Sequence, residues 1–117
     1  MTTTELVGIV RFRFHPGAVE EFKRLAGECM QIVRAKEPGT LQYDTYFNAD
    51  ESECITIERF RDSDSLIQHG QNLAHLMDAI IATGDVHGEL LRDPSPEVRA
   101  AIGDGGPVQL FTRWSSM

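Results

Sequence analysis

The sequence predicts an α+β domain in which one antiparallel sheet is covered by two helices on a single face. Short segments with apolar residues at every second position are typical of strands. They are separated by two long stretches in which apolar residues recur at three- and four-residue steps, as in helices. The order strand, helix, strand, strand, helix, strand is that of a split βαβ arrangement.

The first strand is expected over residues 5–14, where the alternation places Val7 and Ile9 on the face opposite to most other apolar side chains. A His-Pro-Gly turn at residues 15–17 ends this strand. Helical spacing then continues from Val19 to Val33 and predicts a long helix. Glu-Pro-Gly at residues 37–39 ends that helix, because a proline disfavours the helical conformation of the residue before it.

Two further strands, residues 40–47 and 53–61, are expected to form a hairpin around a turn at residues 48–51. Asp62 to Ser65 then supply candidate N-caps for a second helical stretch, which runs to residue 81. Gly70 lies inside this stretch and is a candidate break between a short turn and a main helix.

Residues 86–91 are expected to form a fourth strand, although the glycine at position 88 weakens that prediction. In the C-terminal extension, residues 93–117, Ser95 and Pro96 are typical of the start of a short helix. A last strand, residues 108–114, could pair with a sheet edge within the subunit or across a dimer. We expect one domain over residues 1–117, with a core at about residues 5–92, since cores divide only beyond ~250 residues.

Composition and charge exclude several classes of function. The net charge is -7 and the basic residues are scattered, so we expect no nucleic-acid partner. No apolar run approaches the ~20 residues that span a bilayer, and the N-terminus does not resemble a signal peptide, so we expect no membrane association. The cysteines, Cys29 and Cys54, are expected to be small buried side chains in a cytoplasmic protein.

The second face of the sheet needs a cover. If Val7 and Ile9 lie there, a lone subunit exposes an apolar patch that soluble monomers rarely tolerate. Self-association would bury this patch. We therefore expect a homodimer that packs sheet against sheet.

Several residues fall where a known family has them. They are Glu37-Pro38-Gly39, Tyr43, Glu58-Arg59-Phe60, Asp62 to Leu66, His69 and His75. With this spacing the chain resembles the antibiotic biosynthesis monooxygenase (ABM) family, small dimeric ferredoxin-like proteins, over roughly residues 5–82. The resemblance implies oxidation of electron-rich phenols or quinols by molecular oxygen without a cofactor. Haem-degrading members make haem chemistry a lower-ranked alternative, because the positions that would carry it are not recognisable here.

His69 and His75 are the candidate catalytic residues, since an imidazole can remove a phenolic proton near neutral pH. Six residues separate them, which is about 240° around an ideal helix, so they share a face only if the helix breaks at Gly70. The alternative for each is a capping or solvent-facing role. This spacing, without a third convergent ligand, does not predict a metal site.

Four residues are candidates for substrate binding: Tyr43, Glu58, Phe60 and Asn72. A carboxylate in the centre of a strand either lines a cleft or forms an ion pair, and Arg11, Arg13 and Arg61 are possible partners of Glu58. Tyr43 could orient a substrate or fill core space, and Asn72 could contact a ligand or cap the main helix.

The sequence contains no phosphate-binding, dinucleotide or flavin motif, so any oxygen chemistry would use the electrons of the substrate and no cofactor. The favoured function is a cofactor-independent monooxygenase that acts on a small aromatic quinol or polyphenol. The alternative is a non-catalytic dimer that binds a small hydrophobic metabolite, since the same cleft would serve both.

Overall fold

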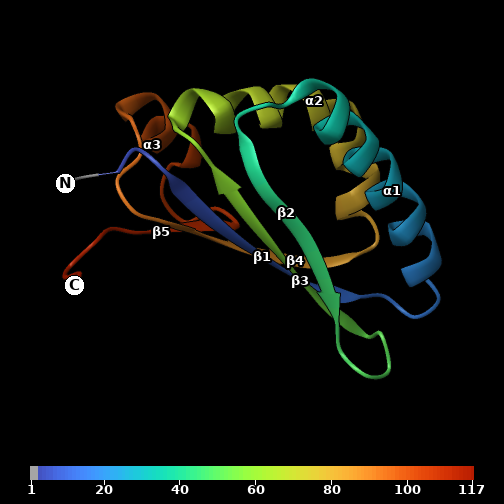
Figure 1. Cartoon of the computed structure of the whole chain (residues 1–117). Coiled ribbons are helices and arrows are strands. Elements are labelled where there is room, and N and C mark those ends of the chain that lie inside the picture. Colours follow the sequence, from blue (N-terminus) through green and yellow to red (C-terminus); the bar gives the residue numbers. More distant parts are fainter. Residues whose placement is uncertain (1–2) are drawn as a thin grey trace.

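A computed structural model of the chain describes residues 3–117. The elements are, in chain order, β1 (Leu6–Phe14), α1 (Val19–Lys36), β2 (Thr40–Phe47), β3 (Glu53–Phe60), α2 (Ser63–Ile81), β4 (Gly84–Leu91), α3 (Pro96–Ile102) and β5 (Val108–Phe111) (Figure 1). The predicted ferredoxin-like order of strands and helices is confirmed, with α3 and β5 appended to it. Within the described residues, no helix combines the length and the apolar character that crossing a membrane requires.

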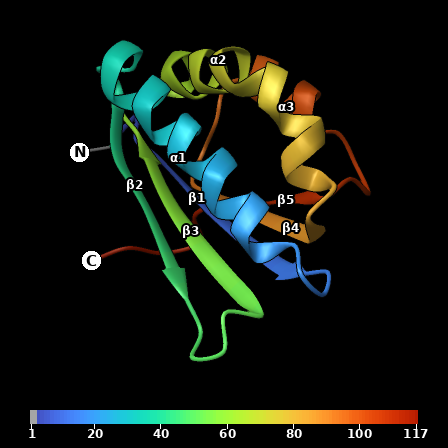
Figure 2. The ribbon, with the colours of Figure 1, turned by 90° about the vertical axis from the view of Figure 1, so that its right-hand side faces the viewer.

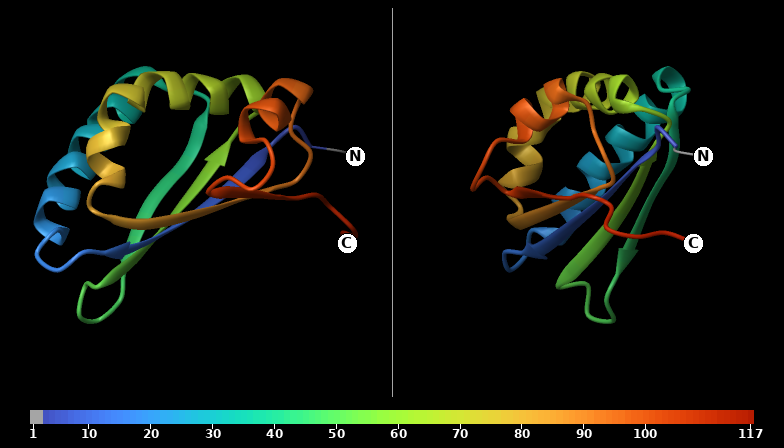
Figure 3. Two further views of the ribbon diagram at one scale, coloured as in Figure 1. Left: turned by 180° about the vertical axis from the view of Figure 1, so that it is seen from behind. Right: turned by 90° about the vertical axis from the view of Figure 1, so that its left-hand side faces the viewer.

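The five strands form one sheet in the order β2-β3-β1-β4-β5. The pairs β2–β3, β3–β1 and β1–β4 are antiparallel. Strand β5 runs parallel to β4 at the edge of the sheet. Helices α1 and α2 lie on the same face of the sheet, as Figures 1 and 2 show. The opposite face carries no helix of the described chain (Figure 3).

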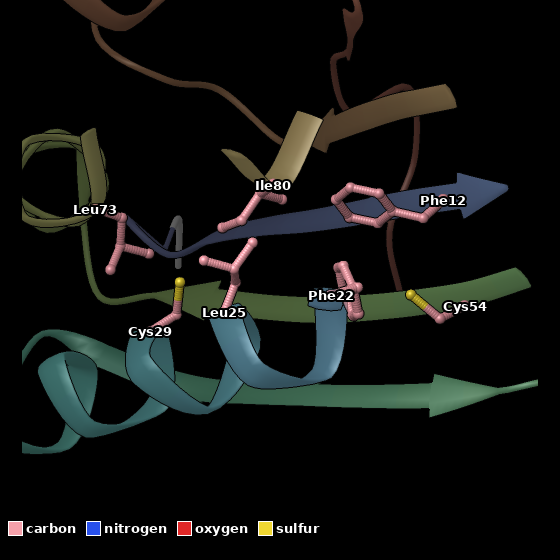
Figure 4. Close-up of a cluster of buried hydrophobic side chains, with 7 residues drawn as sticks. All are labelled: Phe12, Phe22, Leu25, Cys29, Cys54, Leu73 and Ile80. Carbon is pink, nitrogen blue, oxygen red and sulfur yellow. The ribbon is translucent and has the colours of Figure 1, made fainter. Parts of the chain in front are cut away.

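Buried side chains form two apolar clusters between the sheet and the helices. The larger cluster lies under α1 and the second half of α2 (Figure 4), and its members are Phe12, Phe22, Leu25, Cys29, Cys54, Leu73 and Ile80. The smaller cluster consists of Leu6, Phe60, Leu90 and Val98. On β3, Glu58 falls between Cys54 of the first cluster and Phe60 of the second, so a polar site separates them.

Helix α2 is continuous through Gly70, so the candidate break there does not occur. The helix begins at a well-formed cap, because the side chain of Asp62 accepts a hydrogen bond of 2.8 Å from the backbone N–H of Ser65. Buried Leu73 and Ile80 then anchor its second half. These interactions offset the ~1 kcal/mol by which a glycine disfavours a helix interior.

The weak strand prediction around residue 88 has a physical explanation in the structure. A Cβ added at Gly88 would lie 3.2 Å from a methyl group of Val108. The glycine therefore lets β5 approach β4, and the backbone N–H of Gly88 donates a 2.7 Å hydrogen bond to the carbonyl of Pro107. The last strand thus pairs within the subunit, and it ends at Phe111, earlier than expected, leaving Trp114 exposed.

The uncovered sheet face is partly apolar, as the alternation in β1 predicted. Ile9 pairs with Ile57 across β1 and β3, and both side chains are half-buried in the isolated chain. Arg11 and Arg13, farther along β1, are exposed on this face. The homodimer that would cover these residues stays a prediction.

Candidate active site

Glu58 occupies the centre of β3, and its side chain points toward the helices, on the same side as Thr56 and Phe60. The side chain is only 15% exposed. Gly8 of β1 pairs with Glu58, and a Cβ added at Gly8 would lie 3.4 Å from a carboxylate oxygen of Glu58. The glycine leaves the space that this carboxyl group occupies.

His69 lies on the buried side of α2, between two carboxyl groups. Its Nδ1 is 2.7 Å from Oε1 of Glu37, and its Nε2 is 3.8 Å from Oε2 of Glu58. Aromatic rings hold the imidazole from two sides, with centroid distances of 5.4 Å to Tyr43 and 5.0 Å to Phe60. The ring is therefore fixed in orientation, with Nδ1 hydrogen-bonded to Glu37 and Nε2 facing Glu58.

Glu37 is held by two further hydrogen bonds. The hydroxyl of Thr40 donates to Oε1 over 2.8 Å, and the amide of Asn72 donates to Oε2 over 3.1 Å. Glu37 is also the C-cap of α1, and its backbone N–H donates to the carbonyl of Val33. The carboxylate of this helix end thus connects α1, β2 and α2.

The turn after Glu37 requires a glycine. A Cβ at Gly39 would collide with the side chain of Ser65 in the first turn of α2. Because Gly39 has no side chain, the turn lies directly against α2 and brings Glu37 within reach of His69. The Glu-Pro-Gly segment therefore does more than stop a helix.

The pKa values of Glu37 and Glu58 are shifted in opposite directions. Burial raises the pKa of Glu37, but hydrogen bonds from His69, Thr40 and Asn72 outweigh it, and the pKa lies below its usual value. Burial also raises the pKa of Glu58, and there the opposing effect of His69 is too small to cancel it. An ionised Glu37 accepts from Nδ1–H of His69, which leaves Nε2 directed at Glu58.

A cavity of about 620 Å³ opens beside Glu58, bounded by the sheet, α2, α3 and β5. Its lining is mostly apolar and includes Val10, Phe60, Leu66, Ile67, Leu90 and Val98. This volume is in the range of sites that hold small organic ligands. Among the residues described above, Glu58 and Phe60 line this cavity, whereas His69 and Glu37 do not.

A sequence model of the family described as antibiotic biosynthesis monooxygenase matches residues 6–77, more than half of the chain. The chain belongs to the antibiotic biosynthesis monooxygenase family. The resemblance noted in the sequence is thereby confirmed. The cluster of Glu37, Glu58, His69 and Asn72 lies inside the segment that matches the ABM family, whereas α3 and β5 lie beyond it.

Solved structures share the fold at low sequence identity. MupZ from Pseudomonas fluorescens is 20% identical, with 98% of this chain and 94% of that chain covered and a TM-score of 0.83. SnoaB from Streptomyces nogalater, described as a cofactor-independent oxygenase, is 17% identical (80% and 96% covered, TM-score 0.67). Rv0793 from Mycobacterium tuberculosis is 23% identical (78% and 96% covered, TM-score 0.68). No curated protein matches this ABM-family chain.

The structure brings five of the six predicted site residues together and leaves one apart. His69, Tyr43, Phe60, Glu58 and Asn72 form one connected group. His75 is exposed on α2. With the helix unbroken, the 240° between the two histidines turns His75 away from the cluster.

Two of the alternatives weighed from the sequence are not what the structure shows. Asn72 lies in the interior of α2 and does not cap it, since its amide bonds Glu37. Glu58 does not pair with an arginine. Each arginine considered has another partner: Arg11 pairs with Glu89, Arg13 with Glu53 and Arg61 with Asp62.

Tyr43 packs on the side of His69 that faces α1, and it is not among the residues that line the 620 Å³ cavity. Burial, together with the nearby Cys29 and Glu58, raises the pKa of its hydroxyl, which therefore stays protonated at neutral pH. Tyr43 thus packs against the imidazole of His69 without lining the cavity.

Three residues that contact the candidate site are not among those predicted from the sequence: Glu37, Thr40 and Gly8. Glu37 belongs to the motif shared with the ABM family, which was a usable signal for its place in the site. Residues 3–117 contain no group of three or more His, Cys, Asp or Glu side chains arranged to hold a metal ion.

Proposed function

We propose that this protein is a cofactor-independent monooxygenase that oxidises a small aromatic phenol or quinol with molecular oxygen, and that Glu58 is its general base. The observation that carries the proposal is the position of Glu58, a buried carboxyl group on the wall of an apolar cavity with His69 behind it. The description of SnoaB as a cofactor-independent oxygenase supports the reaction class.

In the proposed reaction, Glu58 accepts the proton of a substrate hydroxyl, and the resulting phenolate is rich enough in electrons to react with oxygen. One oxygen atom forms the new C–O bond and becomes a carbonyl of the quinone. The other leaves as water with the two hydrogens that the substrate loses, and the substrate supplies all four electrons. A raised pKa suits Glu58 to this task, because a base is most effective when its pKa is near the working pH.

The residues behind Glu58 hold and stabilise it. Nε2 of His69 faces Glu58 at 3.8 Å, and Glu37 fixes the imidazole in this orientation through Nδ1. The mostly apolar lining gives Glu58 a less polar surrounding than water, and electrostatic interactions are stronger in such a surrounding. His69, predicted from the sequence to contact the substrate, is in this proposal a positioning residue.

Oxygen uptake by the purified protein tests the reaction class. A panel of quinols, polyphenols and anthrones is tested with a metal chelator present and with autoxidation subtracted, and the product is analysed after reaction under ¹⁸O₂. We expect uptake proportional to protein concentration and one labelled oxygen atom per product. Saturable binding of panel members without uptake would instead establish the alternative, a dimeric binding module.

A further inference from the structure

The segment that follows the ABM-family match forms part of the cavity wall. From α3, the residues that line the cavity are Glu97, Val98, Ala101 and Ile102, and from the connection and β5 they are Pro107 and Val108. Figure 3 shows this segment passing from α3, beside the helical layer, to β5 at the edge of the sheet. Part of the cavity wall is thus built by residues outside the matched region.

This segment is firmly attached to the domain. Val98 is 3% exposed and packs in the cluster with Leu6 and Phe60. The backbone N–H of Ser95 donates a 2.9 Å hydrogen bond to the hydroxyl of Ser63 at the start of α2. At the other end, four residue pairs join β5 to β4. The wall is therefore a built part of the cavity and not a loose tail.

The charged residues that line the cavity are all acidic. The acidic residues in its lining are Glu58, Glu89 and Glu97, and none of the described residues that line it is Lys, Arg or His. The carboxylate of Glu89 pairs with Arg11 over 3.0 Å on the uncovered sheet face, so it does not point into the cavity. Glu58 and Glu97 have no cationic partner in the lining, so an anionic group brought into the cavity would find no side chain of opposite charge there.

We propose that residues 93–111 are the substrate-selecting wall of this site, and that together with Glu58 they admit bulky apolar molecules without negative charge and reject their anionic analogues. Val98, Ala101, Ile102 and Val108 limit the size of the substrate, and Glu97 adds its charge at the rim. This inference rests on the proposed function for its substrate, but it concerns binding and does not need turnover.

Two dyes with the same skeleton test whether the cavity rejects negatively charged molecules. N-phenyl-1-naphthylamine is neutral, and 8-anilino-1-naphthalenesulfonate adds one sulfonate. Fluorescence titration of the full chain at pH 7.5 is expected to give at least about tenfold weaker binding of the sulfonate, because like charges oppose each other in an apolar site. Glu97→Gln should narrow the ratio between the affinities for the two dyes, because it removes a negative charge from the rim of the cavity. Equal affinities of the wild-type protein for the two dyes would overturn the proposed selection against negative charge.

Two tryptophan variants on one helix test the wall. Ala101 lines the cavity, whereas Ala100 is exposed on α3 and does not line it. Ala101→Trp is expected to weaken binding of the neutral dye by about tenfold or more, since the indole takes ligand volume, and Ala100→Trp should leave it within about twofold. Thermal unfolding checks both variants, and Ala101→Leu replaces the tryptophan if that variant is unstable. Equal affinities of the lining and control variants would overturn the proposal, because the dye would then bind elsewhere, such as on the open sheet face.

The dye experiment separates this inference from the proposed chemistry. Selective dye binding without oxygen uptake would support the substrate-selecting role of residues 93–111 and refute the monooxygenase function. Oxygen uptake that Ala101→Trp leaves unchanged would support the monooxygenase function and refute the substrate-selecting role.

Discussion

Burial of Glu58 implies a conflict between function and stability at a single residue. Its pKa is raised in the folded protein, so the folded state binds this proton more tightly than the unfolded state. The stabilising contribution is full below the unfolded value of about 4.3 and is lost as the pH rises through the folded value. Glu58→Gln should therefore raise the melting temperature more at pH 8 than at pH 4. A variant that is less stable than wild type at pH 8 would show that the charged form is well solvated.

Glu37 should show the opposite pH dependence. Its lowered pKa means that it stabilises the fold above about pH 4.3 and that this contribution is lost as the pH falls through its folded value. Glu37→Ala leaves the donors of His69, Thr40 and Asn72 without their acceptor, which should cost about 1–3 kcal/mol or more in the free energy of unfolding at pH 7. Urea denaturation measures this cost.

Glu28, an exposed glutamate on α1, provides the control for this measurement. Glu28→Ala should change the free energy of unfolding by less than about 0.5 kcal/mol, as is usual for surface substitutions. The destabilisation by Glu37→Ala should also shrink near pH 3. Equal costs for the two variants at pH 7 would contradict the assigned network.

At the level of helices and turns, replacing two glycines beside the site with alanine should change the stability of the protein in opposite directions. A Cβ at Gly70 meets no atom within 4 Å, so Gly70→Ala should stabilise α2 by about 0.5–1 kcal/mol. Gly39→Ala places its methyl group on Ser65 and should destabilise the protein and displace Glu37. Thermal unfolding of both variants gives the signs, and a stabilising Gly39→Ala would contradict the close approach of the turn to α2.

The strands and helices were predictable because each is specified locally. The period-two alternation of β1, the capping residues before α2 and the Ser-Pro start of α3 appear in the sequence as they do in the structure. The effect of Gly70 was not predictable, since it depends on how strongly buried Leu73 and Ile80 anchor the helix. The role of Gly88 depends equally on β5, which is distant in the sequence.

Some members of the site were predictable from the sequence, but their connections were not. His69, Tyr43 and Glu58 could be identified from the residue pattern shared with the ABM family. The bond between Glu37 and His69 spans 32 residues of sequence, and no local pattern indicates it. The exclusion of His75 follows from the continuity of α2, which only the structure shows.

At the scale of the whole molecule, the uncovered sheet face predicts self-association. We expect sedimentation equilibrium to give twice the chain mass of 13.1 kDa. Ile57→Lys places a charge among half-buried residues of that face and should yield a folded monomer, whereas Ala100→Lys on α3 should not change the mass. A monomeric wild-type protein at high concentration would contradict this prediction and would require another cover for the face.

In the proposed reaction Glu58, and not His75, faces the reacting molecule. The most direct measurement is the rate of oxygen uptake with the best substrate of the panel for wild type, Glu58→Gln and His75→Ala. We expect a loss of about 10²–10⁴-fold for Glu58→Gln, the usual contribution of a general base, and wild-type rates for His75→Ala. Full activity of Glu58→Gln, or a comparable loss in His75→Ala, would contradict it.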